Sequence, residues 1–434
     1  MNQSWPSPST IWRNIVVGLA VSFVALSLGA AFGILSGRGA TVGMISAGLV
    51  SVVTSLFGGT RVQCSGPTAP MSVITAIVVA AAFDTIPTQL PGTDPDQFVN
   101  MVLLLTAGIL ILMGVLRLGR FISLVPNVVI SGFMNGIALL VWASQWRKLF
   151  GSTDDAFEGP VWINTSVAIA TLVLIYLFPR FVARLPECVH PLIPPATLVA
   201  LVSMTVLAQW LQLPIETTDV SGELTSWAAL GDVIARQIPT DWSLSLLVLA
   251  LPFGFQLAAL CYLDTLLTSL VVDRITGEAT RQNQELIAQG AANGIVAFIG
   301  GIPGAQATIR SVLVIKEGGT LRLAGVCIGL FVLAEMVLLQ DLIAMIPQAV
   351  FAGILFKVGY DVFDLPPLWS YLRRWVGRPI QPGQVGVQNR EFALILGTTM
   401  VTFLWDLNVA VVLFSAAFYL INYWRRDDPI RDLR

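Results

Sequence analysis

Long apolar runs recur along the chain from Ile15 to Tyr423, and they constrain the fold more than any other feature. A helix needs about 20 apolar residues to cross a bilayer. Charged residues make up only 12% of the 434 residues, roughly half the share that is typical of soluble domains. The sequence therefore predicts an all-α membrane protein, in which lipid replaces water around most of the surface.

Fourteen apolar segments can be placed on this basis, twelve of spanning length and two short ones. Those of the first half are 14–36, 40–57, Pro67–Ala82, 99–116, 122–144, 161–179 and 192–211. Those of the second half are 245–272, 285–300, Ala305–Ile315, 322–339, 341–358, 391–409 and 409–424. Seven elements in each half make the second half insert upside down relative to the first. We therefore predict a 7+7 inverted repeat.

The loops between these segments differ in charge on the two sides of the predicted membrane. Arginine and lysine gather in alternate loops, for example at Arg117, Arg120, Arg373 and Arg374, whereas acidic loops alternate with them. Cytoplasmic loops carry the excess of basic residues. We therefore expect both termini in the cytoplasm.

The two short elements occupy the third place in each half, and each follows a stretch rich in glycine and proline, Cys64–Thr68 and Gly300–Gly304. Paired interrupted segments in corresponding positions are the best sequence sign of a transporter site. Free N–H groups and the positive dipole ends of two such helices would attract an anion. Thr68 and Thr308 would add hydroxyls there, although a threonine in a membrane helix often bonds only its own backbone.

Asp264 is a lone carboxylate inside the apolar run Leu257–Val272. A charge at that depth is a functional-site hypothesis by default, and Thr268 follows on the same helix face. These oxygens suit a hard cation, but Asp264 would equally carry a coupling proton or serve as a structural hydrogen-bond centre. Arg310, one turn into the second short helix, would either raise the potential for an anion or pair with Asp264.

Other polar residues point less clearly to a function. His190, the only histidine, has no sequence partners that would make it a catalytic base. Glu285 and Gln289 lie one turn apart and read as residues of a helix start or as packing near the site. The scattered cysteines have no metal spacing, no motif of an enzyme occurs, and the net charge of −2 argues against nucleic acid. We expect a transporter, not an enzyme, with no cofactor and no metal other than a coupling ion.

Several motifs carry a resemblance to one family: Leu56–Thr60, Ser65–Met71, Ser131–Phe133, Asp264–Ser269 and Asn283–Gly290. Together they resemble the signature of the SulP anion transporters (solute carrier family 26), over nearly the whole chain from about residue 14 to 424. Many members of that family have glutamate at the position of Asp264. In having aspartate there, this chain resembles the sodium-dependent bicarbonate transporters of cyanobacteria within the family.

The resemblance implies a single transmembrane domain over 1–434, built from a core (about 14–116 and 245–340) and a gate (about 117–211 and 341–424). The core would move like an elevator against the gate in a bacterial inner membrane. The resemblance implies that Thr68 and Ala307 contact the anion, and Thr308 and Arg310 are further candidates from their positions in the second short helix. Those implied to hold sodium are Asp264, Thr268, Thr308 and the backbone of Gln306.

Three departures from the family pattern stand out: Gln306 replaces a glycine, Ser27 replaces a proline, and no STAS domain follows the last helix, which leaves a homodimer open. The expected function is sodium-dependent bicarbonate symport into the cell. A proton-coupled sulfate or dicarboxylate carrier and an anion channel are the alternatives. A nucleobase permease shares this fold, but it would be expected to carry a carboxylate on the second short helix, which has none before Glu317.

Overall fold

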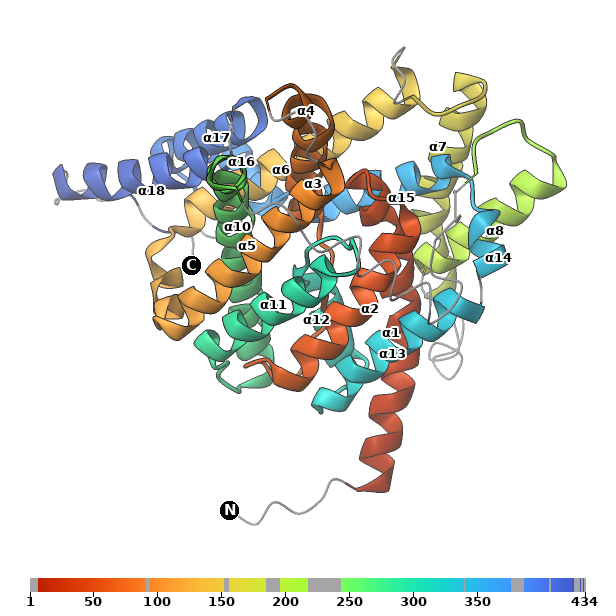
Figure 1. Ribbon diagram of the computed structural model, residues 1–434, viewed down its shortest axis with the longest axis horizontal. Helices are drawn as coiled ribbons and strands as arrows, with labels where there is room; N and C mark the ends of the chain where they lie inside the picture. The colour runs from red at the N-terminus through yellow and green to blue at the C-terminus, as the bar shows by residue number, and fades with distance from the viewer. Residues whose placement is uncertain are drawn as a thin grey trace. The chain divides into compact units, whose positions relative to one another are not determined.

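The computed structural model describes residues 7–89, 94–151, 156–184, 196–217, 243–338, 340–375, 386–405, 407–424, 430 and 432. Almost all of the regular structure in these ranges is helical (Figure 1). Seven of the described helical stretches are long and apolar enough to cross a membrane. The predicted class, a mainly helical membrane protein, is therefore confirmed.

Each of the fourteen predicted segments contains a helix. Those of the first half are α1 (Pro8–Leu35), α2 (Ala40–Phe57), α3 (Ala69–Ala80), α5 (Pro95–Val115), α6 (Asn127–Phe150), α7 (Val161–Val182) and α8 (Ala196–Trp210). Those of the second half are α10 (Leu244–Thr276), α11 (Gln282–Ala297), α12 (Thr308–Lys316), α13 (Arg322–Leu338), α15 (Gln348–Val362), α17 (Asn389–Leu404) and α18 (Leu407–Trp424).

The structure differs from the predicted segments at three places. The helix α3 continues through a π-helical turn (Ala81–Thr85) and α4 (Ile86–Gln89), so this element is longer than predicted. The predicted segment 341–358 is divided into α14 (Gln340–Ala344) and α15, with Pro347, which cannot donate a backbone hydrogen bond, just before α15. The amphipathic helix α16 (Leu365–Trp375) was missed, because Arg373 and Arg374 lower its mean hydropathy.

Two strands of two residues each, β1 (Ser65–Gly66) and β2 (Ala305–Gln306), pair antiparallel. Ser65 lies opposite Gln306, and Gly66 lies opposite Ala305. The all-α prediction missed this ladder, because a two-residue strand is too short to show an alternating pattern in the sequence.

The chain divides into two compact units, 1–120 with 148–354 and 121–147 with 355–434. In the first unit α1 packs on α2 and α13, while α5 packs on α10 and α11 (Figure 1). Small residues permit the close approach of α1 and α2, since a Cβ added to Gly43 would lie 2.1 Å from the carbonyl oxygen of Gly29. Both strands belong to this unit.

The second unit has its own apolar core. That core consists of Val128, Val387, Leu394, Ile395, Phe418 and Ile430, against which Tyr371 and Phe392 also pack. The two compact units do not have the bounds predicted for core and gate, because residues 148–211 fall in the first unit. Core and gate are defined by relative movement, and they stay a prediction.

Candidate functional site

The segments that lead into α3 and α12 cross at the ladder of β1 and β2. Beyond the ladder, Ala307 donates from its N–H to the carbonyl of Cys64 (3.1 Å), and Cys64 donates from its N–H to the hydroxyl of Ser311 (3.1 Å). A Cβ added to Gly304 would lie only 2.5 Å from the backbone of Gly66. The starts of α3 and α12 therefore lie together at one crossing, as the sequence suggested.

Thr68 precedes α3 in an extended conformation, and its side chain makes no cap bond to the helix that follows. The hydroxyl instead donates to Oδ2 of Asp264 (2.7 Å). Asp264 lies beyond the middle of the long helix α10 and is partly exposed. Asp264, in the second half of the chain, therefore contacts the start of a short helix in the first half.

Thr268 lies one turn beyond Asp264 on the same helix, and its hydroxyl is 2.5 Å from the hydroxyl of Thr308, the first residue of α12. Thr268 is 1% exposed, whereas Thr308 is exposed. Between Asp264 and Thr268 in sequence, Thr265 accepts a hydrogen bond from the N–H of Gln306 (3.3 Å). One helix, α10, thus contacts the starts of both α3 and α12.

Arg310 is the largest fully buried side chain of the described residues, at 1% exposure. Its Nη2 donates to the carbonyl of Pro67 (2.7 Å), while Nη1 has no partner among the described residues. No ion pair within 4.0 Å joins Arg310 to Asp264 in the part of the chain that the structure describes. Of the two roles left open, pairing with Asp264 is therefore not observed. Ala307, just before α12, is 9% exposed.

The side chain of Gln306 is fully buried beside the ladder. Directly opposite residues of an antiparallel pair point to the same face, so Gln306 shares a face with Ser65. Its Oε1 accepts from the hydroxyl of Thr60 (3.4 Å), and its Nε2 lacks a partner within the described residues. The side chain of Gln306, which stands where the family pattern has glycine, thus points away from Gly66 and towards a layer of buried polar side chains.

Three polar side chains on α11 form that layer. Glu285, Gln289 and Asn293 are spaced by four residues, which places them on one helix face, and all three are fully buried. We call them the α11 ridge. Glu285 and Gln289 were read from the sequence as residues of a helix start or as packing near the site, whereas Asn293 was not singled out.

The α11 ridge holds both leading segments. Glu285 accepts from the N–H of Thr60 (2.9 Å), and Gln289 donates to the hydroxyl of Ser65 (2.8 Å). Asn293 takes both backbone groups of Gly304, accepting from its N–H (2.7 Å) and donating to its carbonyl (3.0 Å). Glu285 also lies in the first turn of α11, so both interpretations hold for it, whereas the contacts of Gln289 support the packing role.

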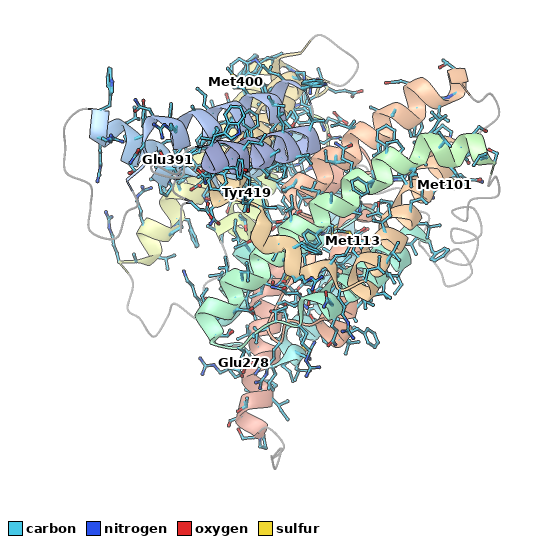
Figure 2. All side chains as sticks on the ribbon, turned by 90° about the vertical axis from the view of Figure 1, so that its left-hand side faces the viewer. Met101, Met113, Glu278, Glu391, Met400 and Tyr419 are labelled. Carbon is cyan, nitrogen blue, oxygen red and sulfur yellow. The ribbon has the colours of Figure 1, made fainter. Side chains whose placement is uncertain are left out.

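A cavity of about 1190 Å³ opens behind the crossing, between the end of α10 and the loops at 59–62 and 320–323. The ion pair between Arg61 and Glu278 (2.7 Å) lines it, and both side chains are about half exposed. Glu278 is labelled in the lower part of the view in Figure 2. Thr60 also lines the cavity and touches Gln306. None of the residues implied to bind the anion lines this cavity.

The donors near Asp264 are carboxylate and hydroxyl oxygens, the ligand type of hard cations. Among the described residues no group of three or more histidines, cysteines, aspartates and glutamates could hold a transition metal. His190 lies outside the described residues. The oxygen atoms around Asp264 thus suit a hard cation, and the two neighbouring helix starts favour an anion.

Comparison with known proteins gives one consistent family. The sulfate permease family matches residues 11–375. The bicarbonate transporter BicA of Picosynechococcus sp. is 34% identical over 92% of this chain and 68% of its own length. YbaR of Bacillus subtilis, whose name assigns it to sulfate transport, is 26% identical over 97% of this chain and 79% of its own.

A solved structure agrees with these sequences. The transmembrane domain of a cyanobacterial BicA superposes with a TM-score of 0.74 at 29% identity, over 94% of this chain and 98% of that domain. The helical fold and the motifs around the crossing thus have a common explanation. The chain belongs to the sulfate permease (SulP) family of anion transporters, and it is a transporter rather than an enzyme.

Proposed function

We propose that this transporter takes up bicarbonate together with sodium. The proposal is carried by one arrangement: α10 places Asp264 against Thr68 at the start of α3 and Thr268 against Thr308 at the start of α12. An anion and a cation bound at these neighbouring positions would attract each other, so each would increase the affinity for the other. This is the physical basis of symport.

The anion would lie between the two helix starts. Unsatisfied N–H groups and the dipole ends of α3 and α12 favour negative charge there. The residues in contact would be Thr68, Ala307 and Thr308, and the buried guanidinium of Arg310 would raise the local potential from behind. Residue 306 would contribute its backbone to the neighbouring cation site.

Sodium would be held by Asp264, Thr268, Thr308 and the backbone of Gln306. An uncompensated carboxylate at membrane depth is costly, and Asp264 has no cationic partner within 4.0 Å among the described residues. A bound cation would remove that cost. The choice of bicarbonate rests on the similarity to BicA, which is named a bicarbonate transporter.

Transport would follow an elevator-type alternating-access mechanism. The antiparallel pairing of β1 and β2 is what a 7+7 inverted repeat would give, since the two leading segments then run in opposite directions. The core (about 14–116 and 245–340) would carry the site past the gate (about 117–211 and 341–424). The protein would lie in a bacterial inner membrane with both termini in the cytoplasm, and a homodimer stays open.

The second candidate is proton-coupled sulfate transport, which is favoured by the similarity to YbaR. In that case Asp264 would carry the proton. Uptake of labelled bicarbonate and labelled sulfate into vesicles, each with and without a sodium gradient, separates the two functions. We expect bicarbonate uptake that requires sodium. Sulfate uptake that ignores sodium and rises with an inward proton gradient would replace the proposal by the second candidate.

A further inference from the structure

A second carboxyl group lies within a predicted span, away from Asp264. Glu335 is the only charged residue between Arg322 and Asp341, and it lies about 20 Å along α13 from Arg322. It is 8% exposed. Its Oε1 is 2.6 Å from the hydroxyl of Ser22 on α1, which is fully buried. Glu335 was not singled out from the sequence.

The hydrogen bonds around Ser22 show where the protons can lie. The hydroxyl of Ser22 is 2.7 Å from the carbonyl oxygen of Leu19 and 2.6 Å from Glu335, but a hydroxyl carries only one proton. A carbonyl can only accept. If the proton of Ser22 goes to Leu19, the proton on the second bond must belong to the carboxylic acid of Glu335.

The opposite assignment, an ionised Glu335 that accepts from Ser22, is the costlier one. The second carboxyl oxygen, Oε2, is buried and has no hydrogen-bond partner among the described residues. A buried carboxylate with a single neutral donor keeps most of its desolvation cost. As the carbonyl oxygen of a neutral acid, the same atom is far less costly to leave unpaired.

No charged group compensates Glu335 from the elements packed around it. α13 packs on α1, α2 and α14; their only charged residues are Arg13 and Asp341, and neither pairs with Glu335 in the described structure. Arg13 lies about 13 Å along α1 from Ser22. Cys327, the other titratable group on α13 besides Arg322, lies about two turns away.

We propose that Glu335 and Ser22 form a proton-binding site between α1 and α13, separate from the site at Asp264. The acid O–H of Glu335 donates to Ser22, whose hydroxyl donates on to Leu19. Release of the proton to solvent leaves an unpaired carboxylate between two packed helices. An unfolded glutamate ionises at about pH 4.3, so the folded protein loses stability as the pH rises from about that value until Glu335 itself ionises, and loses no more above that point.

Infrared spectroscopy of the purified full chain in lipid nanodiscs tests the protonation state directly. The difference between wild type and Glu335→Gln at neutral pH should contain the C=O band of a protonated carboxylic acid. That band should disappear from the wild type at alkaline pH. The matched control Glu317→Gln removes an exposed acid and should leave the band in place. Identical spectra of wild type and Glu335→Gln would overturn the proposal.

Ser22→Ala gives an independent test that keeps the carboxyl group. Without its acceptor the acid should remain protonated, and its C=O band should move to higher frequency. An unmoved band would exclude Ser22 as the partner. Thermal unfolding from about pH 4 upwards supplies a third readout: as the pH rises to the point where the infrared band disappears, the wild type should lose more stability than Glu335→Gln does. Equal losses in the two proteins would contradict the predicted cost of ionisation.

Discussion

Thr68 donates a hydrogen bond of 2.7 Å from its hydroxyl to Oδ2 of Asp264, although the two residues lie 196 positions apart in the chain. The bond ties the start of α3 to α10. The contact between Thr268 and Thr308 does the same for α12. The two starts therefore share one polar centre, on which the proposed transport depends.

Removal of the Thr68 hydroxyl should weaken this centre without changing the shape of the side chain. A hydrogen bond to a charged group contributes about 1.5–3 kcal/mol, which corresponds to roughly ten- to a hundredfold in affinity. Thr68→Val should therefore raise the half-saturating concentrations of anion and sodium, as measured by initial uptake rates in proteoliposomes. Thr68→Ser should keep near-normal values.

Thr75→Val is the matched control for Thr68→Val, because the Thr75 hydroxyl bonds only the carbonyl of Met71 in its own helix. It should leave both half-saturating concentrations unchanged. If Thr68→Val behaves like Thr75→Val, the Thr68 hydroxyl has no role in binding.

The crossing of β1 and β2 should not tolerate a side chain at Gly304. An added Cβ would lie 2.5 Å from the backbone of Gly66, which itself has a φ of +152°, and such overpacking costs about 1–3 kcal/mol. Gly304→Ala should lower the thermal stability and abolish uptake. Gly108→Ala on α5 has open space around it and should raise stability by up to about 1 kcal/mol. Normal transport by Gly304→Ala would show that the tight crossing is not required.

The α11 ridge should be needed to hold the crossing in place. Asn293→Leu leaves the N–H of Gly304 without its partner, which costs about 1–3 kcal/mol for a buried group, and it leaves the carbonyl of Gly304 with only the weak thiol donor of Cys261 (3.4 Å). We expect lower thermal stability and reduced uptake. Gln284→Leu removes a half-buried amide of the same helix, which bonds the carbonyls of Phe57 and Gly58, and should have a much smaller effect. Equal effects of the two variants would argue against a special role of the ridge.

Gln306 tests whether a side chain or only the backbone serves the cation. Gln306→Gly keeps the ladder and the N–H bond to Thr265, and it removes an amide nitrogen that has no partner within the described residues. Sodium-dependent uptake should persist. Loss of the sodium dependence in this variant, measured in the same proteoliposomes, would make the Gln306 side chain a ligand.

The sequence predicted what is local. The length and apolarity of each run located fourteen helical segments, and isolation in an apolar run marked Asp264. The Thr68–Asp264 bond, the ladder, the contacts of Glu285 and Gln289 and the Ser22–Glu335 pair join residues that are between 196 and 313 positions apart, and no local pattern encodes such pairings. Glu335 had the same signal as Asp264, a lone charge in an apolar run. α16 was missed because its charged face masks an amphipathic helix.

The most direct test of the central claim is labelled bicarbonate uptake by Asp264→Asn, measured with and without sodium in proteoliposomes. Asparagine keeps the size of the side chain but removes the charge that would hold the cation. Glu278→Gln, which removes an exposed acid of the cavity rim, is the control and should transport normally. We predict that the sodium-stimulated uptake rate of Asp264→Asn is at least about tenfold lower than that of the wild type, which corresponds to about 1.4 kcal/mol. Uptake that keeps both its rate and its sodium dependence in Asp264→Asn would contradict the account.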